Sequence, residues 1–174
     1  MTDGSVFDLP VLAASRWMFT CYAILGDDGS VVMVDAGLPS SAQGALNSLR
    51  GAGRQPEDVT AVLATHGHSD HVGGMSTVLD QTAARALLPE RCRHYLEGET
   101  PRNFGVDANV RFLPMMGQHP FKPAALRELA QVGRTDGYGR RPTFALPFIP
   151  SGYLADGDPV PGAQVVVCPS ERAL

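Results

Sequence analysis

The sequence predicts an α/β protein with a single domain over residues 1–174, and three observations support this prediction. Two short apolar runs, Val31–Val34 and residues 59–65, are typical of strands that are covered on both faces. Helical spacing of apolar residues separates them, so strand, helix and strand follow within about 35 residues. The length of 174 residues is enough to bury a hydrophobic core without disulfides or a structural metal.

The first elements are expected to be strands. Residues 6–11 form a short apolar run, and Pro10 within it is tolerated only in an edge strand. Residues 17–25 are rich in aromatic and apolar side chains and predict a second strand. The sequence Asp-Asp-Gly at 27–29 is a hairpin-turn signal, which leads into the strand at Val31–Val34.

A crossover unit is predicted next. Ser40 or Ser41 can cap a helix over residues 41–50, and Gly51 or Gly53 follows its end. The strand at 59–65 comes after this helix. The pair Gly73-Gly74 then leads into a helix over 75–83 and a short strand over 85–88.

The prolines divide the chain into two unequal halves. Three of the 14 prolines precede residue 88 and eleven follow it, so residues 6–88 are expected to be regular and residues 89–174 rich in loops. The remaining predicted elements are helices over 90–97 and 123–132, a loop over 133–142 and a strand over 165–167.

Composition excludes several classes of partner. The net charge is −4, whereas binding to nucleic acid or to an anionic membrane needs a clustered excess of basic residues. No apolar stretch is long enough to span a membrane, and the N-terminus lacks the basic and apolar regions of a secretory signal. The three cysteines, Cys21, Cys92 and Cys168, are far apart and are expected to be reduced thiols of a cytoplasmic protein.

One cluster points to metal chemistry. Three of the five histidines, His66, His68 and His71, fall within six residues, together with Asp70. Positions 66 and 68 follow a strand, so both imidazoles project to the same side, and Gly67 between them leaves room. Imidazoles and a carboxylate suit zinc, and also iron or manganese. The alternative is a solvated histidine-rich turn with no metal.

These residues resemble a known family. The segment THGHSDHVGG at 65–74 is similar to the signature of the metallo-β-lactamase superfamily, and VVMVDAG at 31–37 resembles the strand and turn that precede it there. The resemblance implies an αβ/βα sandwich with the metal site at one edge of its two sheets. It implies His66 and His68 as ligands of a first metal and Asp70 and His71 as ligands of a second. Asp70 would also be catalytic, orienting or deprotonating the metal-bound water, and Asp35 would support the site without being a ligand.

The function implied by the resemblance is that of a zinc-dependent hydrolase with one or two ions. Metal-activated water would attack an ester, thioester, lactone or lactam bond of a small-molecule substrate. Two alternatives stay open at this point. One is a non-catalytic metal-binding remnant of such an enzyme, and the other is an iron-dependent oxidoreductase relative.

The second half of the chain matches the family less well. Glu171 stands where the resemblance implies a third histidine, and nothing later supplies the bridging aspartate or the final histidine. His119 as the third ligand with Asp158 as the bridge is an alternative. The first half of the fold is therefore expected to be complete and the second half incomplete, as in a C-terminally truncated enzyme. Exposed apolar sheet surface would then favour self-association.

Overall fold

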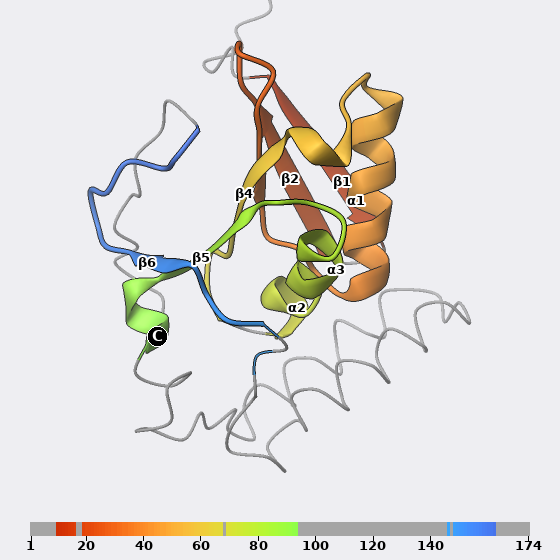
Figure 1. Ribbon diagram of the computed structural model, residues 1–174. Coiled ribbons are helices and arrows are strands. Elements are labelled where there is room, and N and C mark those ends of the chain that lie inside the picture. The colour runs from red at the N-terminus through yellow and green to blue at the C-terminus, as the bar shows by residue number, and fades with distance from the viewer. Residues whose placement is uncertain (1–9, 17–18, 68, 94–145, 147, 163–174) are drawn as a thin grey trace, which may run out of the picture.

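The computed structural model describes residues 10–16, 19–67, 69–93, 146 and 148–162, and it shows a sheet with helices packed against it (Figure 1). In this part of the chain the sheet has six strands in the order β1-β2-β3-β4-β5-β6. They are β1 (Val11–Arg16), β2 (Phe19–Leu25), β3 (Val31–Val34), β4 (Val59–Leu63), β5 (Arg85–Pro89) and β6 (Gly152–Leu154). The mixture of strands and helices agrees with the predicted α/β class.

The sheet changes from antiparallel to parallel at β3. Strands β1, β2 and β3 pair antiparallel, and β3, β4, β5 and β6 pair parallel. The predicted hairpin turn joins β2 to β3. Its Asp28 Oδ1 accepts hydrogen bonds from the Ser30 backbone N–H at 2.9 Å and from the Ser30 hydroxyl at 2.6 Å. Gly29 has a φ of 90°, a conformation that favours glycine, so the turn signal is confirmed.

The predicted crossover is present as β3, then helix α1 (Pro39–Gly51), then β4. Helix α1 buries Ala42, Ala45, Leu46 and Leu49 and packs on β1, on β2 and on helix α3 (Met75–Leu79). The predicted serine cap is wrong, because the residue at the N-cap is Leu38 and it makes no side-chain cap. Pro39 explains the start of the helix, because its fixed φ suits the first turn and it has no N–H that needs a partner.

The first predicted strand lies only partly within the described residues. The first strand was expected over 6–11, but β1 begins at Val11, and residues 1–9 lie outside the described residues. Strand β1 pairs along its whole length with β2, and at one pair the Ser15 and Thr20 hydroxyls lie 3.0 Å apart. Small residues therefore form this edge strand, although their own strand propensity is low.

Two further boundaries are set by side chains that capture backbone groups. The strand predicted over 59–65 ends at Leu63, because the Thr65 backbone N–H donates to Asp35 Oδ1 at 2.8 Å instead of joining the sheet. The helix predicted over 75–83 ends at Leu79, and the Thr82 hydroxyl donates a hydrogen bond to the carbonyl of Val78 at 2.9 Å. Such local side-chain bonds compete with regular secondary structure.

Short elements complete the described chain. Helix α2 (Ser69–Val72) follows β4, and two 3-10 helices lie at Pro56–Asp58 and Glu90–Cys92. The strand predicted over 85–88 is confirmed as β5. The helix predicted over 90–97 is a 3-10 helix at its start, and its remainder lies outside the described residues. The elements predicted over 123–132, 133–142 and 165–167 lie outside them as well.

The core has two parts, one on each face of the sheet. The larger part lies between the sheet and the helices and includes Val31, Met33, Leu46 and Met75, all 0% exposed. On the opposite face Val32, Ala61, Leu87 and Val160 form a smaller cluster. The segment after β6 supplies Val160, so part of the loop-rich half covers this face. Within the described residues, no helix is long and apolar enough to cross a membrane.

Candidate metal centre

The candidate site lies where two neighbouring parallel strands end. Because β3 and β4 are parallel, the loops that leave their carboxyl ends meet at one edge of the sheet. We call residues 35–38 the β3 loop and residues 64–72 the β4 loop. Backbone hydrogen bonds join the β3 loop to the last residue of β4, from Asp35 N to Leu63 O at 2.7 Å, and to the β4 loop, from Ala36 N to His71 O at 2.8 Å. The two loops therefore hold each other in place.

Asp35 is the centre of the polar contacts in the β3 loop. It is 5% exposed and has a φ of 57°, which is uncommon for a residue other than glycine. Its carboxylate accepts hydrogen bonds from the Thr65 backbone N–H at 2.8 Å and from the Thr65 hydroxyl at 2.9 Å. The same carboxylate contacts His71 Nδ1 at 2.9 Å. Three donors from the β4 loop thus converge on one buried carboxylate, which stabilises its unusual backbone conformation.

The predicted ligands His66, Asp70 and His71 lie close together in the β4 loop. The His66 and His71 rings have centroids 3.8 Å apart, and Asp70 Oδ2 lies 3.8 Å from His71 Nε2. Two ligands of one tetrahedral zinc ion are separated by about 3.3 Å, given bond lengths near 2.0–2.1 Å. The imidazole and carboxylate therefore fit the chemistry of a shared ion and lie near the separation that it requires.

The electrostatics of His71 reflect its two acidic neighbours. Burial lowers the pKa of this imidazole, but the hydrogen bond and charge of Asp35 and the charge of Asp70 raise it, and the net direction is upward. Asp35 contacts Nδ1, and Asp70 lies on the side of Nε2. The ring is thus held from one nitrogen, while the other is directed toward the second carboxylate, as is common for metal-binding histidines.

The structure brings together some of the predicted site residues. His66, Asp70 and His71 are adjacent, but among the described residues no three His, Cys, Asp or Glu side chains form a complete ligand set. His68 lies outside the described residues, as do the alternative ligands His119 and Glu171. The alternative bridge Asp158 lies in a turn after β6, where its Oδ2 accepts from the Ala155 backbone N–H at 2.8 Å.

Thr65 is a residue of the site that the sequence reasoning missed. Besides its bonds to Asp35, its hydroxyl lies 3.1 Å from His66 Nδ1 and 3.3 Å from His71 Nδ1. Its position directly before the first histidine of the motif was the available signal. The carboxylate of Asp35, which the resemblance implied as a support of the site, contacts both His71 and Thr65.

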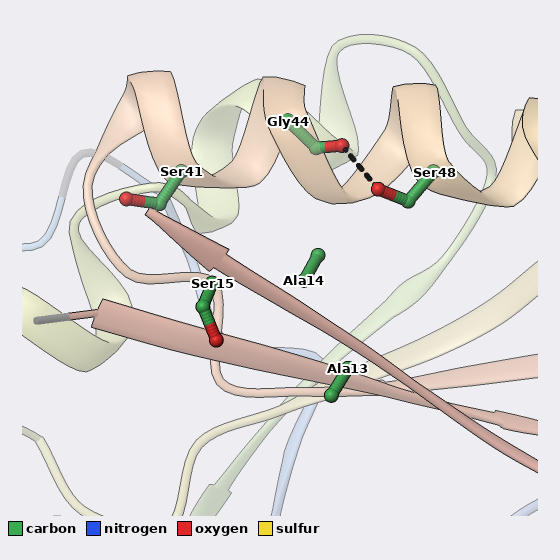
Figure 2. Close-up of a pocket in the computed structure, with 6 residues that line it drawn as sticks. All are labelled: Ala13, Ala14, Ser15, Ser41, Gly44 and Ser48. Carbon is green, nitrogen blue, oxygen red and sulfur yellow. Dashed lines mark hydrogen bonds between the residues drawn. The ribbon is translucent and has the colours of Figure 1, made fainter. Parts of the chain in front are cut away.

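A separate pocket of about 370 Å³ lies between helix α1 and the edge strand β1 (Figure 2). It is lined by Ala13, Ala14, Ser15, Ser41, Gly44 and Ser48. The Ser48 hydroxyl donates to the Gly44 carbonyl at 3.1 Å, whereas the buried Ser41 hydroxyl has no hydrogen-bond partner among the described residues. The lining carries no imidazole or carboxylate, so this pocket is distinct from the candidate metal centre.

Two of the three cysteines are described, and both lie in the core. Cys21 and Cys92 are each 1% exposed. Burial, with a further contribution from the charge of Asp35, raises the pKa of the Cys21 thiol to about 12. The thiolate is the reactive form, so Cys21 acts as a small core residue, as the sequence predicted.

Comparison with known proteins identifies the family. The model of the metallo-beta-lactamase superfamily matches residues 17–158, which is most of the chain. The chain therefore belongs to the metallo-β-lactamase superfamily, and the resemblance found in the sequence is confirmed. Proteins of this superfamily typically depend on zinc. A hydroxyacylglutathione hydrolase from Xanthomonas campestris is 31% identical over 100 residues, which cover 53% of this chain and 37% of that protein.

Solved structures show the same fold. The metallo-β-lactamase MIM-1 from Novosphingobium pentaromativorans matches with a TM-score of 0.57 at 20% identity, covering 90% of this chain and 45% of that one. The class B3 di-zinc metallo-β-lactamase LRA-12 from an Alaskan soil metagenome matches with a TM-score of 0.56 at 20% identity, covering 86% and 44%. The chain thus spans less than half the length of these proteins, and the expected partial metallo-β-lactamase fold is confirmed.

Proposed function

We propose that this chain carries the metal-binding part of a zinc-dependent hydrolase that acts on an ester, thioester, lactone or lactam of a small molecule. The observation that supports this most strongly is the arrangement of His71, with Asp35 at Nδ1 and Asp70 3.8 Å from Nε2. This is the geometry expected for an oriented ligand beside a second ligand. Membership of the superfamily and the similarity to a hydroxyacylglutathione hydrolase support a hydrolytic activity.

The proposed ligands are His66, His68, Asp70 and His71, and they would hold one or two zinc ions. Iron or manganese could use the same donors, because imidazole and carboxylate bind all three metals. Membership of a superfamily whose proteins typically depend on zinc favours zinc. When bound, zinc would polarise the bond under attack and lower the pKa of a coordinated water toward about 7.

The chain's own residues would perform two tasks in the reaction. Asp70 is the proposed proton carrier, because its side chain lies at the start of α2 and is 35% exposed to solvent. Its carboxylate would orient the attacking water, take its proton and pass that proton to the leaving group. Asp35 and Thr65 would hold the histidines in place without touching the substrate.

Elemental analysis combined with hydrolysis assays tests the proposal. The purified chain is expected to contain zinc and to hydrolyse a nitrophenyl ester or a lactone. Asp70→Asn should reduce turnover by about 100-fold or more, as removal of a proton carrier does. The matched control is Asp80→Asn, an exposed carboxylate at the end of α3, which should have no effect.

Two results would contradict this function. Bound zinc without turnover of either substrate would indicate metal binding without catalysis, and absence of bound metal would remove the metal centre itself.

Light scattering of the same sample tests the expected self-association. Tyr22 and Ile149, which are 44% and 90% exposed, provide apolar surface for such contacts.

A further inference from the structure

Strand β1 lies at an edge of the described sheet, where it pairs only with β2. Leu25 N donates to Pro10 O at 2.9 Å, so the Pro10 carbonyl points toward β2. Because bonded and non-bonded pairs alternate in an antiparallel ladder, every second residue of β1 directs its N–H and C=O toward β2. The residues between them, Val11, Ala13 and Ser15, direct theirs outward. These three residues, with one donor and one acceptor each, line the edge.

The two edges of the described sheet differ in their protection against a further strand. Strand β6 at the other edge has three residues, and the Arg93 guanidinium lies 4.1 Å from the centre of the Tyr153 ring. Short edge strands and nearby charges hinder the addition of a strand. Strand β1 has six residues in an unbroken register with β2, and residues 11–15 carry neither charge nor proline. The edge at β1 is therefore the one that can accept another strand.

The side chains of β1 are small where another strand would approach. Leu12 and Ala14 pack against the core beneath the helices, and Ala14 points toward α1 in Figure 2. Ala13 and Ser15 point away from the helix and are exposed. At the centre of β1, between Leu12 and Ser15, the side chains on both faces are thus methyl groups.

We propose that β1 pairs with β1 of a second copy of this chain, antiparallel about a twofold axis at Ala13. In this register Ala13 opposes its own copy, and Val11 and Ser15 oppose each other. Every pair then joins outward-directed residues, so all of their N–H and C=O groups gain a partner. An axis at Ala14 would leave Val11 without an opposite residue in β1. The pairing does not depend on the proposed metal site.

The space beside helix α1 favours a second copy over an isolated peptide strand. A twofold axis perpendicular to the sheet places the second α1 on the same face, antiparallel to the first. Packed helices lie about 8–10 Å apart, depending on the side chains at their contact. The pocket of about 370 Å³ between α1 and β1 is lined on the helix by Ser41, Gly44 and Ser48, which share one helix face. These small residues leave room for the second helix, which a peptide strand does not supply.

Sedimentation velocity of the full chain and of charged variants tests the axis. The wild type should be a dimer, and Ala13→Lys should weaken it by about 10-fold or more, because the axis brings two like charges together. Ala13→Glu should do the same. An equimolar mixture of the two variants should form dimers again, since opposite charges then meet. Ala83→Lys is the matched control, because it makes the same change at an exposed residue before β5, and it should leave the dimer unchanged.

Cross-linking tests the register in a Cys168→Ser background, where the described cysteines are buried. Ala13→Cys should form a disulfide between copies, because bonded pairs have Cα atoms about 5.5 Å apart. Ser15→Cys should not, because its two copies would lie four residues apart along the pair, about 14 Å.

Three results would overturn the proposal. They are a monomeric wild type, a dimer that Ala13→Lys leaves unchanged, and a mixture of the two charged variants that stays monomeric although both are folded by circular dichroism. If the charged variants did not fold, failure of Ala13→Cys to cross-link would overturn it instead. Zinc binding and hydrolysis are measured separately, so failure of the proposed function would leave this test intact.

Discussion

The β3 and β4 loops leave adjacent parallel strands at the same edge of the sheet, yet their polar side chains differ in solvent exposure. The β3 loop is buried and contributes one carboxylate, Asp35, which is 5% exposed. The β4 loop carries the candidate ligands, and its His71 and Asp70 side chains are 28% and 35% exposed. The two loops therefore differ in role: the β3 loop supplies a buried acceptor that is fixed in place, and the β4 loop supplies the more exposed side chains that we propose as metal ligands.

The largest effect on the free energy of unfolding is expected from removing the Asp35 carboxylate. Asp35→Ala removes the shared acceptor of the Thr65 N–H, the Thr65 hydroxyl and His71 Nδ1, at a cost of about 1 kcal/mol for each of these part-buried hydrogen bonds. Urea unfolding of the metal-free protein should therefore show a loss of about 3 kcal/mol. Asp35→Asn keeps the shape and one acceptor oxygen, so its loss should be smaller. Unchanged stability in Asp35→Ala would show that the β3 loop does not support the β4 loop.

A second variant tests how closely the β3 loop packs against Gly74, which lies two residues after the β4 loop. Gly74 donates its N–H to Gly37 O at 2.8 Å, and an added Cβ would lie 2.7 Å from Leu38 O and also against Ala36 O. These are backbone atoms that cannot move aside, so Gly74→Ala should cost about 1–3 kcal/mol. Gly44→Ala in helix α1 is the control. It meets no atom within 4 Å and should stabilise the protein by about 0.5–1 kcal/mol. Equal effects in thermal unfolding would contradict the close packing.

The sequence predicted the buried strands that precede the two loops, but not the hydrogen bonds between the loops. The runs at Val31–Val34 and 59–65 contain the strands β3 and β4, because a continuous apolar run is typical of a strand that is covered on both faces. The bond from the Thr65 N–H to Asp35 joins residues 30 positions apart, and local patterns carry no information about such a pair. Strand β6 was missed for the same reason, since it pairs with β5 across more than 60 residues.

The candidate ligands were easier to predict than their geometry. The spacing of His66, Asp70 and His71 placed them in one loop, and the structure confirms that they are close together. The positive φ of Asp35 and the position of the Thr65 hydroxyl arise only when β3 and β4 pair. The preference of serine for the N-cap position also gave a wrong prediction at the start of α1, where Pro39 rather than a serine determines the first turn.

A smaller effect is expected from pH. The pKa of His71 is raised above the 6.5 of a free histidine, so the protonated ring stabilises the folded state. This contribution is complete below pH 6.5 and should be lost as the pH rises through the raised pKa. Urea midpoints of the metal-free protein should decrease over that range, and less so in Asp35→Asn. A midpoint that rises with pH in this range would contradict the assigned contacts of His71.

The smallest effect is expected at Cys21. Its pKa of about 12, raised by burial and then by the charge of Asp35, keeps the thiol protonated at neutral pH. A thiol reagent should therefore leave Cys21 unmodified in the native protein and label it after unfolding, as mass spectrometry can show. Rapid labelling of Cys21 in the folded chain would mean that the core beneath the β3 loop opens readily.

The zinc content of the purified chain tests the central claim most directly. Elemental analysis after gel filtration should find at least one equivalent of zinc in the wild-type protein. It should find almost none in the double variant His66→Ala with His71→Ala, provided that both are folded by circular dichroism. Equal zinc in the two proteins, or none in the wild type, would contradict the assignment of the β4 loop as the metal-binding loop.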